Sequence, residues 1–382
     1  MHIGRVGADR ICEPFGRALP SSPERVAQTS AVNRLFELYG VGRGKGASVS
    51  RVDLLDVTSI SSNCNNVVIR VEAAESALPS TLFVKLPATN LWTRVFCNVL
   101  GIWSNECEFY ANVAERVPFR VPEPFVVADQ GSHFVLMLED LHTDPSVELF
   151  TNLAMIEGVD VDVARKCLST FATLHAAFEG IDPAERARML PPELHPFASP
   201  NARSLSPVLS RAALSPCYRK APFVFTSDMV DLCARAIDKY DRLLDFWFTE
   251  PLTLIHGDSH LGNFFISGAE MGMLDWQAVQ WAKGIRDVQY FLINSMTEAR
   301  LAEHERALVE HYTSELRSRG VELSTDDAWA QYRAYSFQTL MTSVVSIGLS
   351  TMTDMDVVLR VLLQRSVAAV QRNGFADWLE TL

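Results

Sequence analysis

The sequence predicts an α+β protein with two lobes, and three observations lead to this fold class. The chain has 382 residues, more than one domain usually contains. Hydrophobic residues make up 48% of it, enough for a large core. Strand-like runs dominate up to about Asp140, and helical periods dominate afterwards. We therefore expect a tail at 1–30, a small lobe at 31–140 and a large lobe at 141–382, with the site between the lobes.

The first segments carry little chemistry. Residues 1–30 mix charged residues with proline and contain no sustained apolar run, so we expect a partly ordered tail and no signal peptide. The stretch Gly40–Gly46 lacks the glycine spacing of a phosphate loop, and no Ser or Thr follows its lysine. A flexible solvated loop is the better interpretation. The seven cysteines are scattered and never form CxxC, which favours reduced thiols in a cytoplasmic protein.

A polar turn and a lysine-bearing strand come next. The stretch Ser59–Asn66 joins two strand-like runs and contains Ser61, Ser62 and Asn63 but no glycine. Small polar residues can present N–H groups to a phosphate, although an ordinary hairpin turn is the alternative. The following apolar run, residues 82–86, carries Lys85, as expected of a strand that delivers a cation to nucleotide phosphates.

Two further elements complete the expected small lobe. Residues 103–113 show helical periodicity and carry Glu106 and Glu108, which could also be solvated glutamates on a surface helix. The apolar run 135–138 reads as a strand, and it ends in the two acids Glu139 and Asp140.

The residues with the clearest chemistry lie in a loop of the large lobe. Asp258 and Asn263 are five residues apart, and Asp275 ends a short apolar run that reads as a strand returning beside them. Metal-assisted phosphoryl transfer requires this kind of set: one carboxylate takes a hydroxyl proton, while Asn263 and Asp275 hold Mg²⁺ against nucleotide phosphates.

Two histidines in the same loop allow a second interpretation. His256 and His260 have the spacing of a helical H-E-x-x-H zinc pair. Gly257 and Gly262 disfavour a continuous helix, and Gly257 stands where a metalloprotease needs its glutamate. Bracing of the loop by hydrogen bonds is the better account of His256, while the role of His260 stays open.

Together the run from His256 to Asn263 and the segment Leu274–Gln277 resemble the H-G-D-x-H-x-G-N element of the aminoglycoside phosphotransferase and choline kinase superfamily, closest to its ecdysteroid kinase-like (CHK kinase-like) branch. The resemblance implies a two-lobed protein-kinase-like fold, with an antiparallel sheet plus helix in the small lobe and a mainly helical large lobe. It also implies that Asp258 is the catalytic base and that Asn263 and Asp275 are metal ligands.

The same resemblance assigns the remaining site residues. Glu106 would pair with Lys85, and Ser61, Ser62 and Asn63 would cover the phosphates. Backbone groups from Leu138 to Asp140 would bind the adenine edge, while the side chains of Glu139 and Asp140 are expected to be solvated. Asp287, at the start of a buried helix, would brace the catalytic loop together with His256 and His260.

The expected function is therefore ATP- and Mg²⁺-dependent transfer of the γ-phosphoryl group to a hydroxyl of a small molecule, steroid-like by resemblance, with GTP as a possible donor. An aminoglycoside or other antibiotic is the alternative acceptor. A non-catalytic nucleotide-binding module is the alternative from another class. Apolar residues in 197–225 and 337–345 could line an acceptor pocket, but such helical stripes are more often core.

Charge and hydropathy limit the partners. The net charge of −12 argues against nucleic acid, and the acids are too scattered to define a cation site. The uncharged stretch 334–353 is long enough to span a membrane, yet its many Ser and Thr residues favour a buried helix. We expect a monomer or homodimer that does not enter a membrane.

Overall fold

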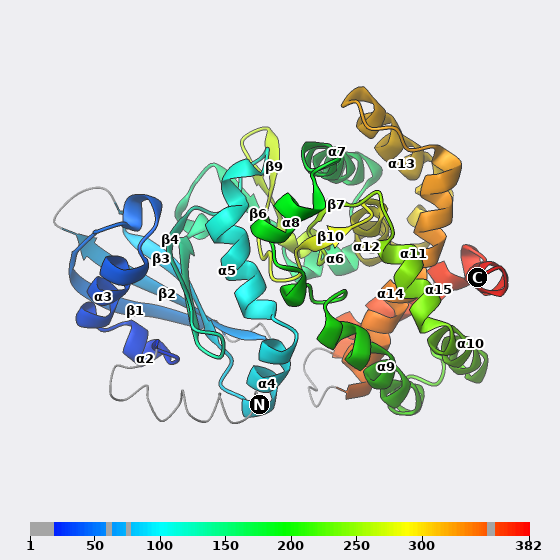
Figure 1. Cartoon of the computed structure of the whole chain (residues 1–382), viewed down its shortest axis with the longest axis horizontal. Coiled ribbons are helices and arrows are strands. Elements are labelled where there is room, and N and C mark those ends of the chain that lie inside the picture. Colours follow the sequence, from blue (N-terminus) through cyan, green and yellow to red (C-terminus); the bar gives the residue numbers. More distant parts are fainter. Residues whose placement is uncertain (1–18, 59–62, 74–77, 350–355) are drawn as a thin grey trace. The chain divides into compact units, whose positions relative to one another are not determined.

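The computed structural model describes residues 19–58, 63–73, 78–349 and 356–382, and it separates into two compact units (Figure 1). The first unit comprises Met1–Val147, Ala187–Pro196 and Trp276–Ala278. The second comprises Glu148–Arg186, Phe197–Asp275 and Val279–Leu382. From the sequence we expected the boundary between the lobes after residue 140. In the structure the first unit continues to Val147 and also includes Ala187–Pro196 and Trp276–Ala278.

The first unit is built on a five-stranded antiparallel sheet with strand order β1-β2-β3-β5-β4. Its strands are β1 (Val49–Thr58), β2 (Cys64–Ala73), β3 (Thr81–Pro87), β4 (Pro124–Asp129) and β5 (Phe134–Glu139). Its helices and 3₁₀ turns are α2 (Pro23–Val26), α3 (Thr29–Tyr39), η2 (Gly42–Gly44), α4 (Leu91–Val99), α5 (Ile102–Asn112), η3 (Ala114–Arg116), η4 (Leu141–Thr143) and η5 (Pro192–Leu194).

Alternation along the central strand β3 sends neighbouring side chains to opposite faces of this sheet. Val84 and Leu86 join a buried apolar cluster that includes Phe36 of α3. Lys85, between them in sequence, is paired instead with Glu106 of α5. Helices α3 and α5 therefore cover opposite faces. Leu19 and Val26 also lie in the apolar cluster, so the described part of the segment expected to be a tail is packed.

The glycine-rich stretch Gly40–Gly46 is only in part the solvated loop that the sequence suggested, because Gly42, Arg43, Lys45 and Gly46 are exposed whereas Gly44 is buried. The backbone of this stretch bridges β4, where Val41 N–H donates to Phe125 O at 3.0 Å. A Cβ built on Gly44 would stand only 2.1 Å from the same carbonyl oxygen. The glycine is therefore required by the close approach of two backbones.

Helices dominate the second unit, as expected for this part of the chain. They are α6 (Asn152–Glu157), α7 (Val161–Ala177), α8 (Pro183–Met189, whose last three residues belong to the first unit), α9 (Pro200–Lys220), α10 (Ser227–Asp238), α11 (Tyr240–Phe248), α12 (Ile285–Ser295), α13 (Glu298–Ser318), α14 (Thr325–Leu349), α15 (Asp356–Arg372) and α16 (Phe375–Glu380). With the antiparallel sheet of the first unit, they confirm the predicted α+β class.

Two small sheets hold the loop that carries Asp258. Strand β7 (Thr253–Ile255) pairs with β10 (Gln280–Ala282), and the second sheet has the order β6-β8-β9. Its strands are β6 (Val147–Leu149), β8 (Phe264–Ser267) and β9 (Glu270–Met273), and the turn η6 (Leu261–Asn263) leads into β8. Short strands thus fix both ends of the loop.

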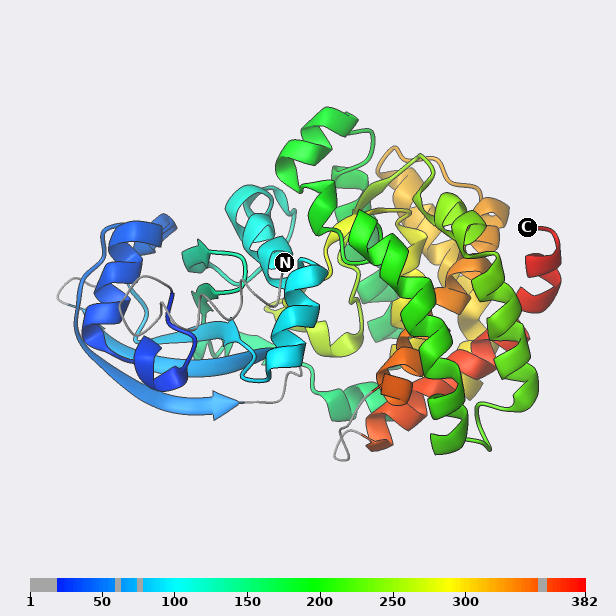
Figure 2. The same cartoon turned by 60° about the horizontal axis from the view of Figure 1, so that its bottom comes forward.

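The uncharged stretch near the C-terminus forms much of α14, which contacts α9, α12 and α15 (Figure 2). Phe337, Leu340 and Val344 are fully buried there, so these members of the apolar stripe are core, as favoured from the sequence. Phe223, by contrast, is 98% exposed and belongs neither to the core nor to a pocket wall. Across the described residues we find no helix with the length and apolar character needed to cross a membrane.

Candidate active site

The first unit contains a buried ion pair between Lys85 on β3 and Glu106 on α5. The Lys85 Nζ lies 2.7 Å and 2.9 Å from the two carboxylate oxygens of Glu106. Both residues are at most 5% exposed. A buried charge pair is costly to desolvate and survives only with good geometry, which both short contacts provide. The pair fixes the lysine ammonium beside a carboxylate, as the sequence predicted for a phosphate-binding lysine.

A second set of contacts ties the segment after Asp275 to α5. Trp276 stacks on Phe109 of α5, with ring centroids 4.2 Å apart. The Gln277 carbonyl accepts the amide of Asn105 at 3.2 Å, and the Gln277 side chain lies 3.5 Å from the amide nitrogen of Asn63. These contacts fasten Trp276 and Gln277 to the helix that carries Glu106.

Asn63 is the described end of the expected phosphate-covering turn. Its carbonyl oxygen accepts the indole N–H of Trp103 at 3.0 Å. Ser61 and Ser62 lie outside the described residues. The anchoring of Asn63 by α5 is therefore the part of this turn that the structure describes.

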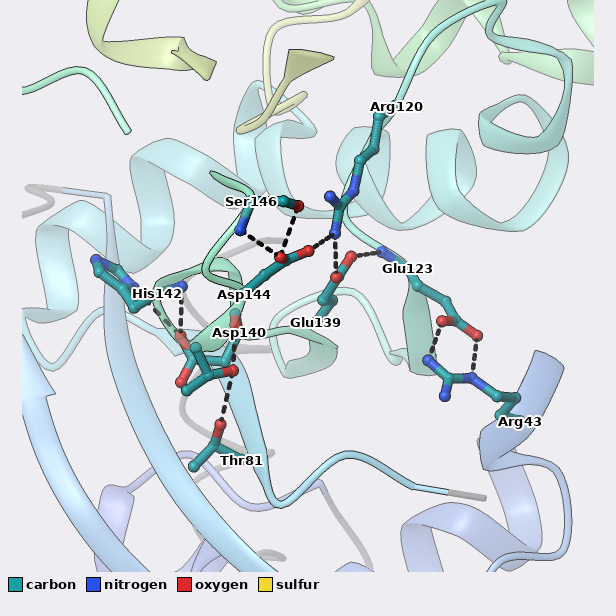
Figure 3. A network of polar contacts seen from close by, with 10 residues as sticks. Arg43, Thr81, Arg120, Glu123, Glu139, Asp140, His142, Asp144 and Ser146 are labelled. Atoms are coloured by element: carbon teal, nitrogen blue, oxygen red, sulfur yellow. Dashed lines mark hydrogen bonds and ion pairs between the residues drawn. The ribbon is translucent and has the colours of Figure 1, made fainter. Parts of the chain in front are cut away.

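The end of β5, where we expect adenine to bind, is held by a polar network (Figure 3). The Glu139 N–H donates to Glu123 O at 2.8 Å, so a nucleotide would have to use other backbone groups of Leu138–Asp140. Asp140 is 4% exposed and accepts the N–H of His142 at 3.2 Å. The expectation that its side chain is solvated was wrong, because Asp140 caps the turn η4.

Glu139 is likewise engaged and not simply solvated. Arg120 donates to Glu139 at 2.5 Å and to Asp144 at 2.8 Å, thereby joining the end of β5 to the segment that follows it (Figure 3). Hydrogen bonds from Ser146, followed by the Arg120 contact, lower the pKa of Asp144 to about 2. Arg120 thus contacts two carboxylates, and this arrangement fixes the backbone around Glu139.

In the second unit, the loop after β7 brings together Asp258, Asn263 and the residue before Asp275. The Asn263 amide nitrogen donates to Asp258 O at 2.7 Å, and Leu274 N–H donates to Asn263 O at 2.9 Å. Because its amide nitrogen is committed to the loop, the Asn263 side-chain oxygen is the end that can serve as a ligand. Asp275 follows directly on the bonded Leu274.

Asp275 has the backbone conformation that most distinguishes this site. Its φ is +64°, and among the described residues it is the non-glycine residue with a positive φ. Such a conformation costs of order 1–3 kcal/mol and persists only where its surroundings impose it, often at functional sites. A carboxylate and an amide oxygen are ligands that Mg²⁺ accepts, so Asn263 and Asp275 fit the predicted cation.

Asp287, at the start of α12, holds the loop that carries Asp258. Its carboxylate accepts the N–H groups of His256 at 2.7 Å and Gly257 at 2.9 Å, and it lies 3.4 Å from His175 Nε2. Burial alone would raise the pKa of Asp287, but the hydrogen bond and charge of His175, with help from His256 and Gly257, hold it below the usual range. The charged carboxylate therefore orders the backbone on either side of Asp258.

His256 is occupied by the loop itself. Its Nε2 donates to Leu274 O at 3.0 Å, and its Nδ1 accepts the N–H of Asp258 at 3.3 Å. Burial lowers the pKa of His256, which keeps the ring neutral and consistent with one donor and one acceptor nitrogen. With both nitrogens used, His256 cannot be the zinc ligand of the alternative interpretation. His260 lies 3.9 Å from Asp258, so it stays close to the proposed base.

Asp258 lines a cavity of about 190 Å³ within the second unit. Tyr290 of α12 lies in the same wall. Burial first, and then the charge of Asp258 and a hydrogen bond to it, hold the pKa of Tyr290 well above its usual range. The guanidinium of Arg286 lies 4.3 Å above the Tyr290 ring and also donates to Gly257 O. A neutral phenol is thus fixed beside the carboxylate.

Sequence reasoning missed Tyr290 and most of this cavity. The apolar stripe of α14 supplies the core, while Thr342, Ser343 and Ser346 of the same helix line the cavity. The available signal was the unusual number of Ser and Thr residues in an otherwise apolar stretch.

Comparison with solved structures shows what the fold is similar to. The ethanolamine kinase of Plasmodium vivax has a similar fold, with a TM-score of 0.54 at 8% identity over 87% of this chain and 83% of that one. The choline kinase LicA of Streptococcus pneumoniae reaches a TM-score of 0.48 at 11% identity over 86% and 95% of the two chains. Among curated proteins, none matches the sequence.

The match that decides the family is one of sequence. The profile of the ecdysteroid kinase-like family matches residues 59–323, which include Lys85, Glu106, Asp258, Asn263 and Asp275. This range covers more than half of the chain and implies a kinase-like function. The fold, the site and the sequence match together show that the chain belongs to the ecdysteroid kinase-like family.

Proposed function

We propose that this protein transfers the γ-phosphoryl group of ATP to a hydroxyl group of a small molecule, with Mg²⁺ as the metal. The observation that carries the proposal is the position of Asp258, a quarter-exposed carboxylate on the wall of a cavity, in a loop whose backbone is fixed by Asp287. A general base needs both access to its substrate and a fixed position. The family's kinase-like function supports the choice of reaction.

In the proposed reaction the hydroxyl oxygen of the acceptor forms a bond to the γ-phosphorus. The bond between that phosphorus and the β–γ bridging oxygen breaks, and ADP leaves. The hydroxyl proton passes to Asp258. Tyr290, which stays protonated beside this carboxylate, orients it toward the cavity.

Two pairs of residues would hold the nucleotide and its metal. Lys85 would contact the α and β phosphates, with Glu106 fixing its ammonium group. Asn263 and Asp275 would hold Mg²⁺, which offsets the negative charge of the phosphates when bound. Support comes from the buried ion pair, the Asn263 amide nitrogen committed to the loop and the strained backbone of Asp275.

The test is the variant Asp258→Asn, which keeps the shape of the side chain and removes the base. We expect phosphoryl transfer from ATP to fall by about 10²–10⁴-fold, the usual contribution of a general base. The affinity for ATP should change by less than about twofold, because the substitution removes no proposed contact with the nucleotide. Phosphorylated product, detected by mass spectrometry over a panel of alcohols, reports on transfer. Transfer at the wild-type rate would refute the role of Asp258.

A further inference from the structure

The cavity beside Asp258 has two chemically different walls. Its volume is about 190 Å³. The lining residues come from α6, α12, α14, α15 and the Asp258 loop: Met155, Asp258, His260, Tyr290, Asn294, Thr342, Ser343, Ser346, Val358, Leu359 and Leu362. Helices α12 and α14 supply phenol, amide and hydroxyl groups, whereas α6 and α15 supply only apolar side chains. A ligand that matches both walls has one hydroxylated side and one apolar side.

Asn294 is one of two residues of this wall that carry a buried polar atom without a partner among the described residues, the other being His260 with its Nδ1. Asn294 is 2% exposed, and its side-chain oxygen Oδ1 accepts no hydrogen bond from the described residues. A buried polar atom without a partner is destabilising, so such an atom on a cavity wall points to a ligand donor. Asn294 lies four residues after Tyr290 on α12, so the two side chains share one face about 5–6 Å apart.

The cavity wall is held in place by Arg365 of α15. Its guanidinium donates to the carbonyl oxygens of Met155 at 2.9 Å and Asn294 at 2.7 Å, and also to Ile156 O. Arg365 is 7% exposed. One side chain therefore ties together α6, α12 and α15, three of the helices that line the cavity. Asn294 is positioned before any ligand arrives, which lowers the cost of binding.

The lining lacks the aromatic cage that is typical of sites for quaternary ammonium groups. Recognition of such a group typically uses several aromatic faces. Among the Phe, Tyr and Trp residues, only Tyr290 lines this cavity. The hydroxyl and amide groups of this cavity instead suit a neutral molecule with hydrogen-bonding groups.

The volume limits the size of the enclosed group. An engineered apolar cavity of about 150 Å³ holds one benzene molecule. A cavity of about 190 Å³ therefore has room for one substituted six-membered ring, and the rest of a larger acceptor would extend out of it. The part of the acceptor that the cavity recognises is a single ring.

We propose that the acceptor presents to this cavity a neutral, hydroxylated ring, with one hydroxyl on Asp258 and a second hydroxyl that donates to Oδ1 of Asn294. The proposal rests on the kinase function proposed above and names the acceptor class and a specificity-determining residue. Asn294 contacts the acceptor but not the reacting bond. It therefore selects diols over single alcohols.

Cyclohexanediols are suitable probes, with cyclohexanol as the single alcohol and choline as the cationic alcohol. Binding to the full-length protein is measured by ligand-observed NMR, and phosphorylated product is measured by mass spectrometry in the presence of Mg²⁺ and ATP. We expect at least one of the 1,2-, 1,3- and 1,4-diols to bind about three- to tenfold more tightly than cyclohexanol, the value of one neutral hydrogen bond.

The variant Asn294→Ala should remove this preference and leave the affinity for cyclohexanol within about twofold. Asn373→Ala is a matched control, because Asn373 is also 3% exposed with an unpaired amide but does not line the cavity. It should retain the preference. Equal binding of diols and cyclohexanol, an unchanged preference in Asn294→Ala, or tighter binding of choline would each overturn the proposal.

Failure of the kinase proposal is detected separately. Stabilisation of the same protein by ATP with Mg²⁺ reports on the nucleotide site and does not involve Asn294. A protein that binds ATP but shows no diol preference loses only the acceptor inference. A protein that shows the diol preference without binding ATP loses the kinase function and retains the diol site.

Discussion

Replacing Asp287 by Asn tests how the catalytic loop is held. The substitution preserves the shape of a fully buried side chain and removes its charge. In the native protein the two oxygens accept the N–H groups of His256 and Gly257. In the variant, one of these N–H groups faces an amide NH₂ group, which cannot accept a hydrogen bond.

The expected cost follows from these contacts. A hydrogen bond to a charged group contributes about 1.5–3 kcal/mol, and a buried donor without a partner costs about 1–3 kcal/mol. With one N–H group left without an acceptor and the other bound to a neutral oxygen, we expect a loss of about 2–4 kcal/mol for Asp287→Asn. The rate of phosphoryl transfer should also fall. The substitution loosens the backbone at Gly257, and Asp258 is the next residue.

Hydrogen exchange of the peptide that contains His256 and Gly257 measures the effect locally. Urea unfolding gives the corresponding global loss. A matched control is Asp182→Asn, since Asp182 accepts the N–H groups of Ala184 and Glu185 at an exposed helix start. This exposed control should lose only about 0.5–1 kcal/mol.

The loss should depend on pH in a defined direction. The pKa of Asp287 is lower in the folded protein than in the unfolded chain, so its contribution is complete above the unfolded value of 3.8. It disappears as the pH falls through the folded value. The difference between wild type and Asp287→Asn should therefore be constant at neutral pH and shrink below about pH 4. A variant that exchanges and unfolds like the wild type at neutral pH would refute this account of Asp287.

Two further substitutions test the first unit. Glu106→Gln removes the negative charge that faces the buried ammonium of Lys85. Thermal unfolding should therefore show a free energy of unfolding lower by about 3 kcal/mol, and ATP should bind more weakly. Glu108→Gln on the same helix should change both quantities little, and equal effects of the two substitutions would contradict the pairing. Gly44→Ala should destabilise this unit by about 1–3 kcal/mol in urea, because its Cβ would meet Phe125 O at 2.1 Å, and an unchanged midpoint would contradict the close approach.

Local sequence patterns were sufficient to predict the elements around the ion pair. A short apolar run with one lysine became the central strand β3, and helical periodicity became α5 with Glu106 on its buried face. The two-residue alternation of a strand and the 3.6-residue period of a helix indicate which side chains point inward. That information sufficed to predict the partners.

The network after β5 could not be predicted in this way. Glu139 and Asp140 looked solvated because their partners are not visible in the strand pattern. Arg120, the partner of Glu139, comes from another part of the chain. The contact of η2 with β4 was missed for a similar reason, because it depends on Gly44, which has no side chain that would indicate packing. Contacts between distant segments are set by the tertiary fold, and a single sequence does not record them.

The cavity beside Asp258 was missed for a different reason. Asn294 lies in a buried apolar helix, where the sequence pattern predicts core on every side. Its amide became conspicuous only when the structure showed that Oδ1 has no partner on the cavity wall. Functional residues of this kind break the local pattern, and their role emerges from what surrounds them.

The central claim is that this protein binds ATP as a metal complex at a kinase site. The most direct measurement is calorimetric titration of the wild-type protein with ATP, once with Mg²⁺ and once with the metal removed by a chelator. We predict binding that weakens by at least about tenfold without Mg²⁺, because the proposed metal ligand Asp275 would then face the phosphates without an intervening cation. No binding of ATP at millimolar concentration, or binding that is indifferent to Mg²⁺, would contradict the account.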